Sequence, residues 1–303
     1  MQYQRNPFDD IKSFFKEKSL LSRLILINIV VFLFVNIINL FLWLFQINPG
    51  NGVGSSPIIE WFAVPSNPEL LIQKPWTLLT YMFLQENFFH LFFNMLVLYF
   101  GGRIFQEYLN YKKLLGMYIW GGISGGLLYV ISFNYFPVFE NAVISSVAIG
   151  ASASVLAILI AIATYVPNYY VHLMIFGRVR LKYLAIILVI IDLISIQGGN
   201  SGGHIAHIGG AIWGFLYIIL LKNGFDLGKK FSLPSFRTKK AGPKKSYTNP
   251  NYGKRPISDE TYNRKSAKKQ KEIDLILEKI SKSGYSSLTK AEKEKLFKMS
   301  NKK

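Results

Sequence analysis

The chain has 303 residues, of which 50% are hydrophobic and 17% charged, with a formal net charge of +18 at pH 7. It contains no cysteine, which excludes disulfides, thiolate catalysis and cysteine-ligated zinc. The charges lie mostly outside the long apolar stretches of residues 24–222, a pattern typical of a membrane domain followed by a basic aqueous tail. The basic excess therefore indicates cytoplasmic segments of a membrane protein rather than nucleic-acid binding.

Four segments are predicted in chain order. Residues 1–23 form a charged, amphipathic N-terminal segment. No small-residue cleavage site follows the first apolar run, so a removable signal peptide is not predicted. Residues 24–222 form the membrane domain, and residues 223–270 form a flexible basic linker without hydrophobic periodicity. Residues 271–303 form a small helical unit.

Six apolar stretches are predicted to cross the membrane, since about 20 mostly apolar residues span its hydrocarbon. They are Leu24–Phe45, Met82–Phe105, Leu114–Phe133, Val147–Val166, the short Lys182–Ile196 and His204–Leu221. We therefore expect an all-α, polytopic membrane protein, built as a six-helix bundle with a soluble C-terminal tail.

The loops alternate in positive charge, and this alternation predicts the orientation. Lys and Arg are concentrated in the N-terminal segment, in the loops after the second and fourth spans, and after residue 222. Lys74 is the only basic residue in the other loops. Because positive loops stay in the cytoplasm, both termini are expected there. The composition, rich in Lys, Ile and Asn, points to a bacterial plasma membrane.

The tail is predicted to contain two short helices. The first presents one apolar face, formed by Ile273, Ile276, Leu277 and Ile280. Gly284 ends it, and Thr289 with Glu292 resembles a capping box for the second helix. The tail is compatible with binding a cytoplasmic partner, with regulation, or with lysines that hold anionic lipid headgroups.

Polar side chains inside the predicted spans are candidate functional residues, because burying them in lipid is costly. His90 and Asn94 lie on one face of the second span, Ser152 near the start of the fourth and His207 near the start of the sixth. In the predicted orientation all four lie in the outer part of the membrane. They are suited to be a nucleophile, a base and oxyanion donors, although polarity and depth alone leave a packing role open.

Small residues on the fourth and sixth spans favour close packing of these two helices. In the sixth span Ala206, Gly210 and Gly214 repeat every four residues, and the fourth span has Gly150, Ala153, Ala157 and Ala161. Such packing would bring the Ser152 hydroxyl within hydrogen-bond reach of His207.

At these residues the chain resembles the rhomboid intramembrane proteases, over roughly residues 60 to 220. His90–Asn94 resembles the family's HxxxN element, Gly150–Ala153 its GxSx element, and Ala206–Gly214 its AHxxGxxxG element. The chain departs from the family pattern at Ala153, where glycine is usual, and at Leu156, where an aromatic ring often stacks on the histidine.

The resemblance implies an intramembrane serine endopeptidase that cleaves transmembrane segments of other membrane proteins within the lipid bilayer. Ser152 would be the nucleophile and His207 the base of a dyad without an acidic member. Asn94, His90 and the Ser152 backbone N–H would stabilise the oxyanion, and the glycine-rich loop 198–203 would cap the site. No metal or other cofactor is implied.

Two further readings of the sequence are stated as expectations. The alternative function is a non-catalytic rhomboid-like membrane protein that binds client transmembrane helices, which loss of Ser152 or His207 would have favoured. Asp192 and His204 are kept outside the catalytic set. His204 fits a solvated helix start or the external mouth, and Asp192 fits a hydrogen-bonded acid near the interface or a gate residue.

Overall fold

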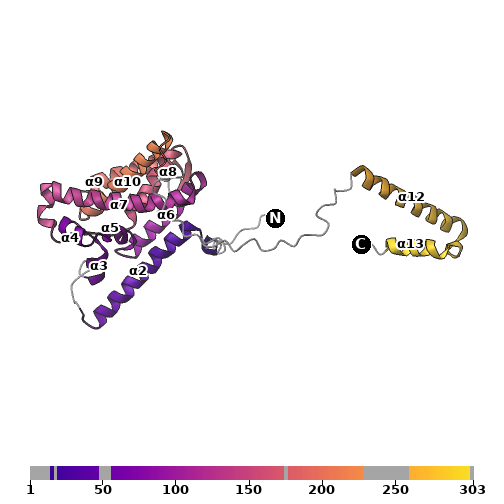
Figure 1. Cartoon of the computed structure of the whole chain (residues 1–303), viewed down its shortest axis with the longest axis horizontal. Coiled ribbons are helices and arrows are strands. Elements are labelled where there is room, and N and C mark those ends of the chain that lie inside the picture. The colour runs from indigo at the N-terminus through magenta and orange to yellow at the C-terminus, as the bar shows by residue number, and fades with distance from the viewer. Residues whose placement is uncertain (1–13, 17–18, 48–55, 174–176, 228–258, 301–303) are drawn as a thin grey trace. The chain divides into compact units, whose positions relative to one another are not determined.

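A computed structural model describes residues 14–16, 19–47, 56–173, 177–227 and 259–300 (Figure 1). The chain divides into two compact units, Met1–Ser235 and Phe236–Lys303. The first contains the predicted membrane domain, and the second contains the predicted C-terminal helices.

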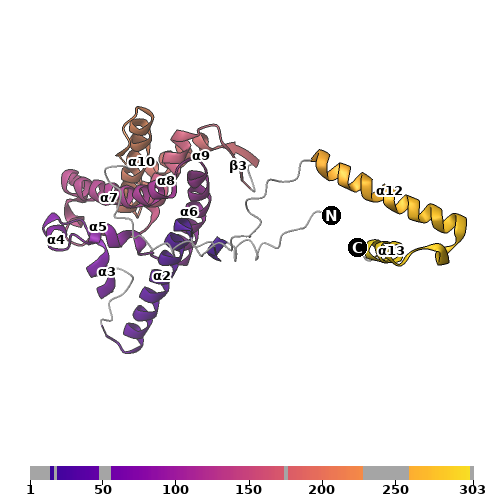
Figure 2. The same ribbon diagram turned by 45° about the vertical axis from the view of Figure 1, so that its right-hand side comes forward.

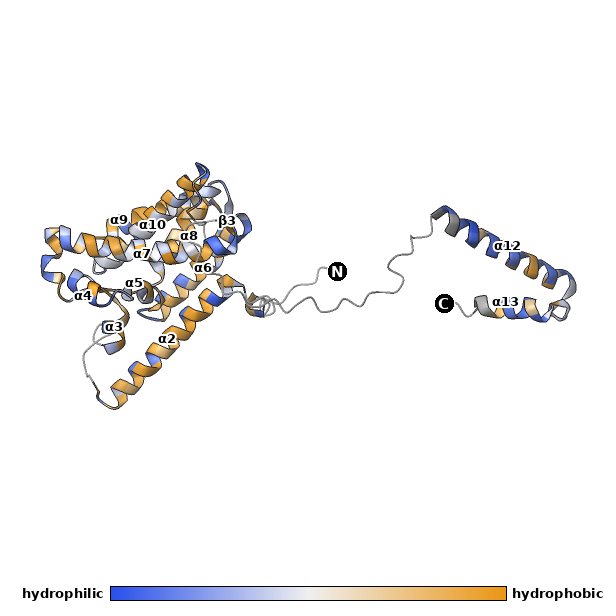
Figure 3. Ribbon diagram, in the orientation of Figure 1, coloured by the Kyte–Doolittle hydropathy of each residue, from blue (hydrophilic) through white to orange (hydrophobic). Residues whose placement is uncertain are grey.

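Four helices of the first unit are long and apolar enough to cross a membrane: α2 (Leu20–Leu44), α6 (Phe88–Tyr108), α7 (Tyr111–Tyr135) and α10 (Ser201–Lys222). They correspond to the first, second, third and sixth predicted spans. The fourth and fifth predicted spans form the shorter helices α8 (Ser152–Tyr165) and α9 (Leu181–Ser195). Hydrophobic residues run along these helices in Figure 3. The chain is thus an integral membrane protein with at least four candidate spans among the described residues.

Short elements connect the long helices. Between α2 and α6 lie α3 (Pro57–Phe62), β1 (Val64–Pro65), α4 (Pro68–Gln73), α5 (Thr77–Thr80) and the 3-10 turn η2 (Tyr81–Phe83). The turn η3 (Pro137–Ala142) and strand β2 (Val147–Ala148) precede α8, and the hairpin β3 (Tyr170–Leu173) and β4 (Gly177–Arg180) follows it. Strands β1 and β2 pair antiparallel, as do β3 and β4.

Two predicted span starts were wrong, each for a local reason. The second span begins at Phe88 rather than Met82, because the Asn87 side chain caps α6 by accepting the His90 backbone N–H at 2.9 Å. The fourth begins at Ser152 rather than Val147, because β2 and Gly150, with φ of +129°, interrupt the helix. The sixth begins at Ser201, three residues before the predicted His204, so part of the predicted glycine-rich loop is helical.

Helix α8 is the centre of the membrane unit. Every residue from Ala153 to Ala163 is buried, against α6, α7 and α10, and Figure 2 shows these helices gathered around it. Small residues permit this approach: a Cβ added to Gly210 would collide with the Ala153 carbonyl oxygen, and one added to Gly214 with that of Ala157. The close packing of α8 and α10 predicted from the small-residue pattern is therefore confirmed.

The C-terminal unit is a pair of helices, α12 (Asp259–Ser283) and α13 (Lys290–Ser300), joined through the turn η4 (Tyr285–Ser287). Helix α12 begins inside the range predicted to be linker. Gly284, with φ of +76°, ends the first helix as predicted. The capping box is confirmed: Glu292 accepts the Thr289 N–H at 2.7 Å. Hydrogen bonds from Thr289 and then Lys279 lower the pKa of the Glu292 carboxyl to about 2.

Candidate active site

Ser152 is the first residue of α8, and the segment before it is fixed on two sides. Strand β2 pairs with β1 through Val64 and Ala148. The Gly150 backbone N–H then donates to the Tyr81 carbonyl oxygen at 3.0 Å. Because the first N–H groups of a helix have no partner within it, the Ser152 hydroxyl lies beside free backbone donors and the positive end of the α8 dipole.

His90 reaches the same place from α6. The Glu86 backbone N–H donates to His90 Nδ1 at 3.3 Å, so in the neutral ring the proton is on Nε2. A Cβ added to Gly150 would lie 3.2 Å from His90 Nε2 and 3.3 Å from Ser152 Oγ. The imidazole and the hydroxyl therefore both lie close to Gly150, where a side chain would collide with the imidazole.

Asn94 is buried one turn further along α6 and belongs to a hydrogen-bond network. Its Nδ2 donates to Gln85 Oε1 at 2.9 Å, and Gln85 Nε2 donates to Asn28 Oδ1 at 3.0 Å. Asn28 Nδ2 in turn donates to the Tyr118 hydroxyl at 3.1 Å. An amide nitrogen has two hydrogens, and the hydrogen bonds among the described residues use one of those on Asn94. The network thus orients an amide that can still donate.

His207 lies on α10, the helix that packs against α8. It precedes Gly210 by one turn, and Gly210 packs against the residue that follows Ser152. Among the described residues no hydrogen bond joins Ser152 to His207. The structure thus brings His90, Gly150 and Ser152 together and places His207 on the adjacent helix.

Asp192 contacts His207, the predicted base. This contact was not predicted from the sequence. Asp192 Oδ1 lies 2.7 Å from His207 Nδ1 and 2.8 Å from His204 Nδ1. Asp192 is buried although it lies on α9, which is otherwise largely exposed. Its polarity within an apolar segment was visible in the sequence, but its partners were not. Both residues that we had placed outside the catalytic set lie beside His207.

The same three side chains could hold a metal ion, since their ligand atoms lie within 4.8 Å of one another. Two short hydrogen bonds to a single carboxylate oxygen account for this grouping without a metal. The expectation that no cofactor is needed stays a prediction.

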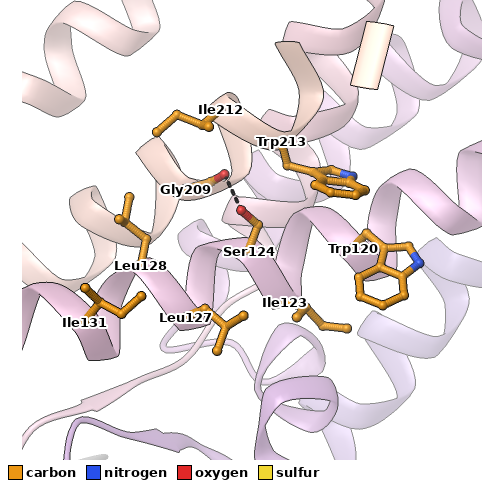
Figure 4. Close-up of a pocket in the computed structure, with 9 residues that line it drawn as sticks. All are labelled: Trp120, Ile123, Ser124, Leu127, Leu128, Ile131, Gly209, Ile212 and Trp213. Atoms are coloured by element: carbon orange, nitrogen blue, oxygen red, sulfur yellow. Dashed lines mark hydrogen bonds between the residues drawn. The ribbon is translucent and has the colours of Figure 1, made fainter. Parts of the chain in front are cut away.

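A hollow lies between α7 and α10. It has a volume of about 330 Å³ and is lined mainly by apolar side chains, among them Trp120 and Trp213 (Figure 4). One polar contact crosses it, from the Ser124 hydroxyl to the Gly209 carbonyl oxygen at 2.9 Å. None of the predicted site residues lines this hollow.

Comparisons with known proteins match both units. The Rhomboid domain family matches residues 73–224, which include all four predicted site residues. A family of unknown function (DUF6576) matches residues 258–302. The curated protein "RHOMBOID-like protein 12, mitochondrial" of Arabidopsis thaliana is 31% identical over 144 residues, which are 45% of this chain and 43% of that protein. The chain thus spans less than half the length of this relative.

Proposed function

Because the chain belongs to the rhomboid family, we propose that it is an intramembrane serine endopeptidase that cleaves transmembrane segments of other membrane proteins. One observation supports the proposal: Ser152 Oγ and His90 Nε2 both lie close to Gly150, and His207 lies one turn before Gly210, which packs against Ala153. A scissile carbonyl bound beside these two side chains would meet a hydroxyl and an N–H donor together.

In the proposed reaction Ser152 Oγ attacks the scissile carbonyl carbon while His207 Nε2 accepts the hydroxyl proton. The negative oxygen of the tetrahedral intermediate accepts hydrogen bonds from His90 Nε2–H, Asn94 Nδ2–H and the Ser152 backbone N–H. The intermediate collapses as His207 returns its proton to the leaving amine. Water then hydrolyses the acyl-enzyme, again with His207 as base.

The length of α8 supports a site inside the membrane. Its 14 residues span about 21 Å, less than the roughly 30 Å of hydrocarbon. The basic hairpin β3–β4, with Arg178 and Arg180, follows its C-terminal end and belongs at the cytoplasmic face. If that end of α8 lies at the inner interface, Ser152 lies below the outer interface, within reach of a transmembrane substrate.

The wider proposal has α8 and α9 as the fourth and fifth of six spans, with both termini in the cytoplasm of a bacterium. The C-terminal helices would then face the cytoplasm, where their lysines can bind anionic lipid or a partner protein.

A fluorophosphonate probe tests the proposal on the purified protein in detergent. We expect labelling of the wild type and none of Ser152→Ala or His207→Ala. The matched control is Ser154→Ala, because Ser154 lies on the same helix but is fully buried beside Met82. Absence of labelling in folded wild type would contradict the proposal and favour the non-catalytic protein that binds client helices.

A further inference from the structure

Asp192 is an isolated carboxylate in an apolar part of the membrane unit. Its neighbours Ile191 and Leu193 are each 51% exposed, whereas Asp192 is 7% exposed and turned toward α10. An unpaired carboxylate at this depth would be very unfavourable, and the two histidine hydrogen bonds compensate for its burial.

The contact fixes which nitrogen of His207 carries the proton. An ionised carboxylate only accepts hydrogen bonds. Since Asp192 Oδ1 lies 2.7 Å from His207 Nδ1, that nitrogen must be the donor. In the neutral ring Nε2 then has a free lone pair, which a general base needs in order to take a proton from serine. The other tautomer would present Nε2–H to Ser152 and could not act as a base.

His204 has a separate effect on the same carboxylate. His204 lies one turn earlier on α10, and its Nδ1 is 2.8 Å from the oxygen atom that His207 contacts, so it is a second donor to an ionised Asp192. Two donors from one helix hold Oδ1 at a defined position relative to α10, although Asp192 itself belongs to α9. The His207 ring is thereby fixed both in its tautomer and in its orientation.

We propose that Asp192 is a positioning residue of the proposed protease, which holds His207 with Nδ1 protonated and Nε2 directed at Ser152. The resemblance led us to expect a dyad without an acidic member, whereas this geometry adds a carboxylate behind the base. The carboxylate also stabilises the positive charge that His207 gains when Ser152 attacks. The inference rests on the proposed function.

Kinetics of Asp192→Asn test the inference, because asparagine keeps the size of the side chain and removes its charge. The measured reactions are labelling by the fluorophosphonate and cleavage of a fluorescent reporter whose single transmembrane helix contains an Ala-Gly pair. We expect kcat to fall by about 10²-fold or more with KM nearly unchanged, since loss of the acid in a Ser-His-Asp triad can lower kcat by about 10⁴-fold.

Two further variants separate positioning from a purely structural role. Ser195→Ala is the matched control on α9, with a polar side chain near the same end of the helix, and should keep the wild-type kcat. Asp192→Glu keeps the carboxylate and should recover part of the activity that Asp192→Asn loses. If Asp192→Asn and Ser195→Ala have the same kcat, the inference is wrong.

Nitrogen NMR of the wild-type protein with ¹⁵N-labelled histidine reads the tautomer directly, without an assumed substrate. The His207 signals, assigned by their loss in His207→Gln, should show the proton on Nδ1. A proton on Nε2 would overturn the inference. If wild type cleaves and labels through Ser152 while Asp192→Asn is as fast, the inference fails and the proposed function stands. If folded wild type does neither, both fail.

Discussion

Helices α8 and α9 are neighbours in the sequence, yet they have opposite environments. Every residue of α8 from Ala153 to Ala163 is buried, whereas α9 buries only Leu181, Ala185 and Asp192. Both helices are strongly apolar, so hydrophobicity does not cause the difference. The nucleophile proposed here lies on the helix that protein surrounds, and the carboxylate behind the base lies on the helix that faces mostly outward.

Small residues explain why α8 is buried. In lipid, apolar surface alone does not drive helices together, so close packing depends on glycine and alanine at the interfaces. Helix α10 supplies Gly210 and Gly214 to α8, and α7 supplies Gly121, where a Cβ would collide with that of Ala157. Helix α9 is composed largely of Leu, Ile and Val and is joined to α10 partly through Asp192. Helix α8 is therefore held by close packing against glycines, and α9 is held in part by the hydrogen bonds of Asp192.

Gly210→Val should have the largest effect, because it separates α8 from α10. Its Cβ would collide with the Ala153 backbone, which cannot move as a side chain can. We expect a loss of about 3 kcal/mol or more in the free energy of unfolding, at or beyond the upper end of usual overpacking costs. Reversible unfolding in mixed micelles measures it. The control is Gly116→Val on α7, where no described atom lies within 4 Å of the added Cβ. Equal losses would point to helix propensity instead of packing.

Gly150→Ala should impair the site more than the fold. The new methyl group would lie 2.9 Å from His90 Cε1 and 3.3 Å from Ser152 Oγ, so it would displace the proposed oxyanion donor. We expect fluorophosphonate labelling to slow by about 10²-fold, comparable to the loss of one oxyanion donor. Gly177→Ala is the matched control, because Gly177 also has a positive φ, of +67°, but an open surrounding. Similar slowing in both variants would show that backbone strain, not the position beside His90, limits the reaction.

The sequence predicted the rhomboid family and the apolar helices, because their signals are local. It misplaced the starts of the second and fourth spans, where one polar cap at Asn87 and one positive φ at Gly150 outweigh the apolar pattern. The roles of Ser152, His207, His90 and Asn94 stay predictions, although the structure gathers three of their helices around one site.

Contacts of Asp192 and Gln85 could not be predicted from the sequence. The hydrogen bond between Asp192 and His207 depends on how α9 turns back onto α10, and no residue spacing specifies that angle. Gln85 lies just before α6, and nothing in the sequence distinguishes it from an ordinary loop residue. In the structure it connects Asn94 to Asn28 on α2. Polar networks that join distant segments carry no periodic signal.

The smallest expected effect comes from a pair of matched substitutions, one on α8 and one on α9, which compares the two helices most directly. Ile158 on α8 is fully buried and Ile191 on α9 is 51% exposed. Replacing each by valine removes the same methylene group, so the chemistry of the two changes is matched. Ile158→Val should lower the free energy of unfolding by about 0.5–1.5 kcal/mol, because surrounding helices cannot fill the gap. Ile191→Val should change it by much less, since lipid or detergent occupies the vacated volume. Equal changes, measured by the same unfolding in micelles, would mean that α9 is packed against protein in solution, and the contrast between the two helices would be lost.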